Sequence, residues 1–543
     1  MRPRVHGAVM PRLPLGWYVV LCAVFVPFVS LRAADPSPAL WGDQGDGTFR
    51  SPVLWSDYNN LDVIPVGDRF YMTAASHHYM GMPVLVSPDM VNWRIIARIY
   101  PRLDLAPRYD QPGQAYQHGT WAPSIRHHEG RFYVYVCTPY EGLIVSTATD
   151  PAGPWTPWHV VKAVEKWEDP CPFWDDVENV GGDGPNGRKA YLIRSQLGAG
   201  PLIIHEMSWD GRRILDEGRT VATGRVLEGP KLSKRNGEYI IFAPEGGIDT
   251  GYQVVLRGAG IYGPYEKRTI LEQGSTSTNG PHQGSWIDLE NGQSWVYHFQ
   301  QKQGWGRIAH LQPAGWRADG WPWIGVDHDG NGIGEPVERP RMPDVGGVHP
   351  LTVPQSSDDF STSNLGLQWM WNHNPDPSGW SLTARPGWLR LSARPLAKAS
   401  GRTGTSGQEP VPFSEDNLHF AYNTLVQHAL GRESSAIVRL DAGGLVEGQR
   451  AGLTLFGRDY GWVGVVKAEG AYQIRARVNE RAFDGGVLVD PVIYLQAAMS
   501  ADSEILLSYS LDGQEYQPLG EPLKVGRTWF EGIKFGLFTY QLS

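Results

Sequence analysis

Glycine-containing turns followed by aromatic-rich strand patterns recur along much of this 543-residue chain. Five such turn-and-strand units lie at residues 67–72, 129–134, 187–192, 236–241 and 292–297. Their spacing of roughly fifty to sixty residues is in the range of propeller blades. We interpret each unit as the turn and inner strand of one four-stranded blade. The pattern therefore predicts an all-β fold that contains a five-bladed β-propeller.

Turns that contain Pro, and in part Gly, close three of these repeats. They lie at residues 87–93, 150–155 and 261–265, and each ends in an aromatic residue. Pro lacks the donor of a strand ladder and Gly accepts unusual backbone dihedrals, so such turns end strands. An antiparallel β protein of another kind, with glycine-rich turns, is the alternative interpretation.

Composition divides the chain into further segments. The repeats occupy residues 36–343, and a stretch rich in Gly, Pro and Ser at 344–357 indicates a linker. Residues 358–543 contain short alternating segments, for example at 388–392, 436–440 and 504–509. Strands at such spacing predict a second domain, a β-sandwich long enough to have its own core.

The N-terminus has the three-part layout of a secretory signal peptide. Basic residues precede an apolar run at about 13–29, and two alanines follow at 33 and 34. We expect residues 1–34 to be a signal peptide and the protein to be secreted or periplasmic, with no membrane association after cleavage. An uncleaved anchor is the alternative.

The charge balance narrows the class of partner. A net charge of −9 without a Lys/Arg stripe argues against a nucleic-acid partner. An aromatic-rich, mildly acidic chain suits neutral polar ligands such as sugars.

Three acidic segments lie beside the repeats, at 57–62, 168–175 and 227–231. Asp169 precedes a Pro and Glu228 precedes a Gly-Pro pair, both amid apolar residues. Burial raises the pKa of a carboxyl group, which lets it serve as an acid near neutral pH. A propeller could bring these acids into one axial funnel. The alternative is that each is an ordinary turn residue.

Several short motifs carry a resemblance to a known family. Those at 69–72, 121–126, 169–175, 228–231, 280–284 and 306–307 resemble glycoside hydrolase family 43. The resemblance implies a five-bladed propeller that acts mostly on xylose- and arabinose-containing chains, with an oligo- or polysaccharide substrate and no required cofactor. Segments at 358–360, 367–369 and 423–425 resemble the concanavalin-like jelly roll of the β-xylosidase branch.

The resemblance also implies roles for individual residues. Glu228 matches the general acid that protonates the leaving oxygen, and Asp169 matches the carboxylate that orients this acid and tunes its pKa. Arg307 matches an arginine that binds sugar hydroxyls, or else it makes a surface ion pair. His282 matches an axial histidine that helps hold a central ion or water cluster, or else it is a structural histidine.

The general base departs from the family pattern. Members of the family invert, so a third carboxylate must activate water on the opposite face of the sugar. Alignment on residues 66–68 places Asn60 at that position, and an amide cannot accept a proton as a carboxylate does. Asp62, Asp57 or an acid from another loop could replace the base. Alternatively, Asn60 positions water in a slow enzyme, or the protein has lost catalysis and kept sugar binding.

Two other groups of side chains are candidate sites. Asp327, Asp329, Asn331 and Glu338 fall at oxygen-ligand positions of a calcium-loop pattern, which predicts a possible structural calcium. A surface turn rich in Asp and Gly is the alternative. Trp121 and Tyr79 could stack on a sugar ring, and the alternative is that each is ordinary packing.

The sequence therefore supports two hypotheses about function. The first is an exported, exo-acting, inverting glycosidase of the β-xylosidase or α-L-arabinofuranosidase type, acting on plant or algal oligomers. The second is a non-catalytic or crippled carbohydrate-binding propeller.

Overall fold

The computed structural model describes residues 41–77, 80–111, 114–396, 416–526 and 531–542. Its regular elements are strands, apart from four short helices: η1 (Pro107–Asp110), η2 (Pro185–Gly187), η3 (Pro377–Gly379) and η4 (Leu418–Phe420). In these ranges, no helix is long and apolar enough to cross a membrane. The predicted signal peptide and Tyr79 lie outside the described residues.

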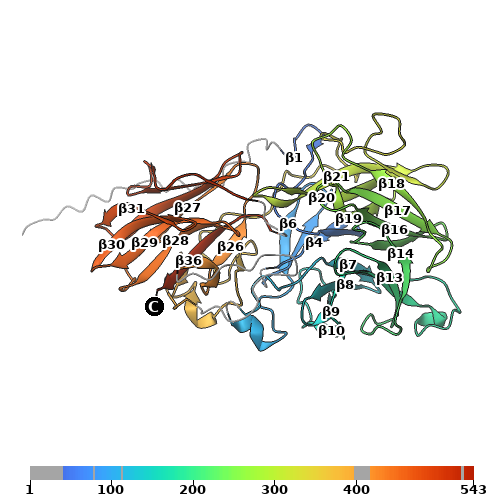
Figure 1. Cartoon of the computed structure of the whole chain (residues 1–543), viewed down its shortest axis with the longest axis horizontal. Coiled ribbons are helices and arrows are strands. Elements are labelled where there is room, and N and C mark those ends of the chain that lie inside the picture. Colours follow the sequence, from blue (N-terminus) through green and yellow to red (C-terminus); the bar gives the residue numbers. More distant parts are fainter. Residues whose placement is uncertain (1–40, 78–79, 112–113, 397–415, 527–530, 543) are drawn as a thin grey trace, which may run out of the picture. The chain divides into compact units, whose positions relative to one another are not determined.

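Five antiparallel four-stranded sheets follow one another along the chain (Figure 1). The first contains β3 (Asp62–Val66), β4 (Arg69–Thr73), β5 (Pro83–Ser87) and β6 (Arg94–Arg98). The second contains β7 (Ser124–His128), β8 (Arg131–Thr138), β9 (Gly142–Ala148) and β10 (His159–Lys162). The third contains β11 (Trp167–Trp174), β12 (Ala190–Gln196), β13 (Leu202–Met207) and β14 (Arg219–Ala222). The fourth contains β15 (Lys231–Arg235), β16 (Glu238–Glu245), β17 (Tyr252–Gly258) and β18 (Glu266–Leu271). The fifth contains β19 (His282–Asp288), β20 (Ser294–Lys302), β21 (Gly306–Trp316) and β22 (Pro322–Ile324). Strands pair in chain order within each sheet, so each sheet is one blade and the predicted five-bladed propeller is confirmed.

The first strands of the blades meet at the centre of the propeller. Strand β3 contacts both β7 and β19, and β11 contacts both β7 and β15. The aromatic-rich runs singled out in the sequence are the second strands, so the prediction that they are inner strands was wrong. The glycine turns join the first strand of a blade to the second: Asn236 and Gly237, with φ of 50° and 82°, connect β15 to β16. The true inner strands bring charged and polar side chains such as Asp62, Arg126 and Lys231 to the axis, and they share no common sequence pattern.

The C-terminal region is a sandwich of two sheets. One has seven strands in the order β23 (Met370–Trp371), β26 (Leu425–His428), β36 (Lys534–Gln541), β28 (Gln449–Phe456), β29 (Gly461–Ala468), β30 (Ala471–Val478) and β31 (Arg481–Leu488). The other has β27 (Ser434–Asp441), β32 (Val492–Met499), β33 (Glu504–Ser510) and β34 (Gln517–Pro518), with β35 (Leu523–Lys524) also paired to β33. Two further pairs are β1 (Gly42–Asp43) with β2 (Phe49–Arg50), and β24 (Trp380–Ser381) with β25 (Arg390–Leu391).

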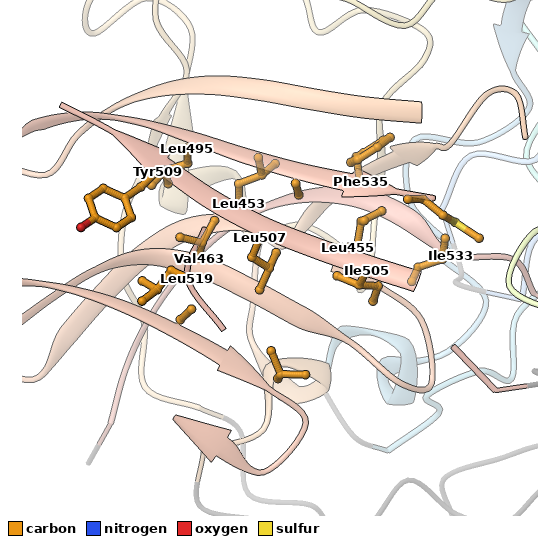
Figure 2. Close-up of a cluster of buried hydrophobic side chains, with 14 of the residues drawn as sticks. Leu453, Leu455, Val463, Leu495, Ile505, Leu507, Tyr509, Leu519, Ile533 and Phe535 are labelled. Atoms are coloured by element: carbon orange, nitrogen blue, oxygen red, sulfur yellow. The ribbon is translucent and has the colours of Figure 1, made fainter. Parts of the chain in front are cut away.

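A buried apolar cluster joins the two sheets of the sandwich (Figure 2). Leu453 and Val463 from the larger sheet pack with Leu495 and Leu507 from the smaller one. Along β32 and β33 of the smaller sheet, buried residues alternate with partly buried or exposed ones. This alternation is the pattern on which the sandwich prediction depended.

Candidate active site

Glu228 and Asp169 come together at the inner ends of the third and fourth blades. The Gly229 amide donates to Asp169 Oδ2 at 2.9 Å, and Ser195 Oγ donates to the same oxygen at 3.0 Å. Gly229 has a φ of 57°, a left-handed conformation that Gly adopts at little cost. The peptide after Glu228 is therefore held against Asp169, as the sequence analysis required for a shared site.

A backbone irregularity adds a third acid, Glu168, to this pair. The register of β11 against β12 shifts between Glu168 and Cys171, and Asp169 has a φ of 53°. Such a bulge re-aims side chains, whereas neighbours in a regular strand point to opposite faces. Carboxylate oxygens of Glu168, Asp169 and Glu228 consequently lie within 4.8 Å of one another. Strand alternation gives no sign of this, and the sequence analysis assigned Glu168 no role.

The crowding of these acids changes their protonation. Burial and the charges of Asp169 and Glu228 raise the pKa of Glu168 to about 9, although the Ala199 amide donates to it at 3.0 Å. Burial and the charge of Glu228 raise the pKa of Asp169 to about 6. The cluster therefore retains a proton at neutral pH.

Glu228 is influenced by cationic neighbours as well as by burial. His282 Nε2 lies 3.1 Å from Glu228 Oε1, and the Glu228 side chain keeps 21% exposure. Burial acts to raise the pKa of Glu228, but the His282 contact and the charges of His282 and Arg307 together lower it below its usual value. In the free protein Glu228 is therefore ionised at neutral pH, and the proton of the three-acid cluster lies on Glu168, so Glu228 must take up a proton before it can act as an acid.

Asn60 lies beside Arg307 and is nearly buried. Nη1 of Arg307 donates to Oδ1 of Asn60 and, at 3.0 Å, to Oδ1 of Asn59. The guanidinium also lies over the ring of Phe299, 4.5 Å from its centroid. Because its charge also influences Glu228, Arg307 links the position expected for the base to the acid. The alternative of a surface ion pair does not fit a side chain that is 4% exposed.

Asp62 and Asp57, the two local candidates for a replacement base, are both held in buried contacts. Asp62 accepts hydrogen bonds from the Ile125 amide at 2.8 Å and from Arg126 Nη1 at 2.7 Å. Asp57 Oδ1 accepts from the Arg307 amide at 3.1 Å, and its Oδ2 lies 3.4 Å from Lys534 Nζ. These contacts occupy the oxygens that a base would have to turn towards water.

The loop with the calcium pattern satisfies many of its oxygens internally. Asp327 accepts from the amides of Gly330 and Gly332, and Asn331 Oδ1 accepts from Ile333 at 2.7 Å. Asp329 accepts from the Asn331 amide in the same way, and Glu338 is exposed. These hydrogen bonds lie within the turn itself, and calcium binding stays a prediction.

Trp121 packs at the edge of an apolar cluster between the second and third blades. Its amide donates to the Cys137 carbonyl at 3.0 Å, and its half-buried side chain lies against a cluster that includes Trp167. Sugar stacking by Trp121 stays a prediction.

Two family models match the chain. The model described as "Glycosyl hydrolases family 43" matches residues 49–322, and the "Beta xylosidase C-terminal Concanavalin A-like domain" matches residues 357–543. Each match covers one of the two kinds of sheet assembly described above.

Similar proteins span nearly the whole chain. A protein of Xylanibacter ruminicola named "Putative beta-xylosidase" is 46% identical over 504 residues, covering 92% of this chain and 88% of that relative. A "Beta-xylosidase" of Formosa agariphila is 36% identical over 550 residues, covering 94% of this chain and 90% of that relative. A solved structure, titled as a bifunctional protein of Bacteroides eggerthii with a family 43 part, is 29% identical with a TM-score of 0.75. It covers 91% of this chain and 62% of its own.

Proposed function

The chain belongs to glycosyl hydrolases family 43, and from that premise we propose that it is an exo-acting, inverting glycosidase. It is a glycoside hydrolase with a carbohydrate substrate, and the resemblance read from its motifs, with the concanavalin-like sandwich, is confirmed. The proposed substrate is a terminal pentose, xylose in the first place and arabinofuranose in the second, on plant or algal oligomers. The names of the two relatives above support xylose.

The meeting of Glu228 and Asp169 is the observation that carries this proposal. Glu228 acts as general acid and donates its proton to the leaving glycosidic oxygen. Asp169, held by the Gly229 amide, orients the acid and adjusts its pKa. Arg307 binds hydroxyls of the terminal sugar while it holds Asn60.

Water activation is the step for which this chain differs from its family. We propose that Asn60 holds the attacking water through its amide, with Arg307 fixing the orientation of that amide. Since an amide is a poor base, the chemical step is expected to be slower than with Asp at this position, by about 10²- to 10⁴-fold. The presence of Asn60 in place of Asp also favours the second candidate, a propeller that binds sugar and hydrolyses it slowly.

Aryl pentosides and xylo-oligosaccharides test the function. We expect single xylose units to be released from one end of the oligomers, with the inverted α-anomer formed first as followed by proton NMR. Cleavage only within the chain, or retention of the β-configuration, would contradict the proposal.

Asn60→Asp tests how water is activated. A large gain over a slow parent supports Asn60 as a weak substitute for a base. A fast parent that Asp57→Ala silences, or that Asp62→Ala silences with azide restoring the rate, would instead identify a relocated base.

Export is a separate proposal that rests on the N-terminal pattern. The mature protein purified from a secreting host is expected to begin close after Ala34. N-terminal sequencing that reads from Met1 would contradict it.

A further inference from the structure

A buried polar cluster lies where the first strands of the five blades meet. We call it the axial cluster, and it consists of Asp62, Ser124, Arg126, Cys171, Lys231 and Ser285. Each of the five inner strands contributes at least one of these residues. The cluster contains one fully buried carboxylate and two cations, and buried charges of this kind are stable only when they are paired.

Asp62 is the centre to which the other side chains point. Its Oδ2 accepts from Arg126 Nη1 and from the Ile125 amide, at 2.7 and 2.8 Å. Its Oδ1 accepts from Ser285 Oγ at 2.5 Å and lies 3.5 Å from Lys231 Nζ. Blades one, two, four and five are therefore joined through one carboxylate.

Two cations extend these links to β11, which carries Asp169, and to β15, which begins three residues after Glu228. Lys231 Nζ donates to Ser124 Oγ at 2.8 Å and to the Pro123 carbonyl at 3.1 Å, which ties β15 to the second blade. Arg126 Nη2 donates to Cys171 Sγ at 2.9 Å, which ties β11 to the same blade. We call these two links tethers. Lys231 contacts Asp62 directly, and Cys171 is linked to Asp62 through Arg126.

The axial cluster lies close in sequence to three residues of the candidate site, Asn60, Asp169 and Glu228. Asn60 precedes Asp62 by two positions, and Asp169 precedes Cys171 by two. Glu228 precedes Lys231 by three. A displacement of any tethered strand is thus passed on within two or three residues to a group that must contact the substrate.

We propose that Asp62, Arg126 and Lys231 are positioning residues that hold β11 and the start of β15, and with them Asp169 and Glu228, in place for the reaction, and that Asp62 is not the base. This inference rests on the proposed glycosidase function. A base must present a free oxygen to water, but both oxygens of Asp62 face donors inside the protein. Misplacement of a reacting group by about 1 Å can lower the rate about 10²-fold, so the tethers act on kcat.

Lys231→Met tests the tether that holds β15, the strand that begins three residues after Glu228. We expect kcat to fall roughly 10- to 100-fold with KM changed far less, since the contacts to substrate remain. Lys234→Met is the matched control, because Lys234 lies on the same strand and pairs with Asp175 and Asp176 outside the axial cluster. Unchanged kcat in Lys231→Met, or an equal loss in Lys234→Met, would overturn the proposal.

The pH profile separates positioning from a purely structural loss. Asp169 is faced by Glu168, Glu228, Cys137 and Lys231, and of these only the lysine lowers the pKa of Asp169. Lys231→Met should therefore move the acidic limb of the kcat profile to higher pH, whereas Lys231→Arg should leave it in place. A limb that stays in place in Lys231→Met contradicts the proposal.

Cys171→Ala cuts the second tether without removing a buried charge, so a folded protein is expected. It should lower kcat about tenfold, and Cys171→Ser, which restores an acceptor for Arg126, should recover most of the loss. Full activity in Cys171→Ala would overturn the role of this tether.

Azide distinguishes a positioning Asp62 from a base. Azide attacks the anomeric carbon without needing deprotonation, so it accelerates a variant that lacks its base and forms a glycosyl azide. Because the parent itself has Asn60 at the base position, we expect azide to accelerate Asp62→Ala by no larger factor than it accelerates the parent. Azide rescue specific to Asp62→Ala would overturn the proposal. If the parent hydrolyses no pentoside, the proposed function fails. Crystal structures of Lys231→Met and of the parent then test the tether by itself, and Glu228 and Asp169 carboxylates at unchanged positions would refute it.

Discussion

Glu168→Gln should make the protein more stable in a pH-dependent way. Folding raises the pKa of Glu168 from 4.5 to about 9, through burial and the nearby charges of Asp169 and Glu228. Above pH 4.5 the unfolded chain releases this proton while the folded chain keeps it, so stability is lost as the pH rises towards 9. Linkage gives a loss of about 1 kcal/mol at pH 5.5 and about 3 kcal/mol at pH 7. Gln keeps an oxygen for the Ala199 amide and has no proton to lose.

Urea denaturation of variant and parent at these two pH values measures the effect. The variant should be more stable than the parent by about 1 kcal/mol at pH 5.5 and by about 3 kcal/mol at pH 7. Activity at pH 7 should change little, because Gln resembles the neutral acid. Glu165→Gln, an exposed site three residues earlier, is the control and should show no pH-dependent difference. A stability difference that is the same at both pH values would refute the assignment of a neutral Glu168.

Three further predictions follow from buried or reacting groups. Glu228→Gln should lower hydrolysis of a xyloside with a poor leaving group by about 10²- to 10⁴-fold, but should spare a dinitrophenyl xyloside; equal losses would exclude Glu228 as the acid. Burial lowers the pKa of His298 from 6.5 to about 4, so its contribution to stability, about 3 kcal/mol, is present above pH 6.5 and is lost as the pH falls towards 4. His298→Gln should flatten this dependence in urea titrations, and an unchanged slope would count against it. Lys534→Met should cost about 3–5 kcal/mol because it leaves the Asp57 carboxylate buried without its cation. Asp57→Asn in the same protein should recover part of that loss, and strictly additive losses in the two-residue cycle would disprove the pairing.

The fold could be predicted from the sequence because the turns between its strands are marked by local residue types. A Gly or Asn with a left-handed backbone is needed wherever a tight turn joins the first and second strands of a blade, as at Asn236 and Gly237. Which strand lines the axis could not be read in the same way. The inner strands differ in length and composition, from the mostly apolar β3 to the aromatic-rich β11, and their polar side chains are paired with residues of other blades.

The grouping of the candidate residues could be predicted in part, because local motifs mark some of them. Glu228, Asp169 and Arg307 lie in motifs that can be compared with a family, and the structure brings them together. The contacts of Asp62 and Asp57 depend on residues far away in sequence: Arg126 lies 64 positions from Asp62, and Lys534 lies 477 positions from Asp57. Spacing along a strand shows which face a carboxylate occupies, but not which cation from a distant part of the chain pairs with it.

The positive φ of Asp169 limits what mutational libraries can reveal about this position. Asn and Gly take up such a backbone readily, whereas Val, Ile or Thr would deform the bulge and displace the neighbouring Glu168. Inactive clones from saturation mutagenesis would therefore mix a lost charge with a distorted chain. Asp169→Asn is the exchange that removes the charge and leaves the main chain as it is.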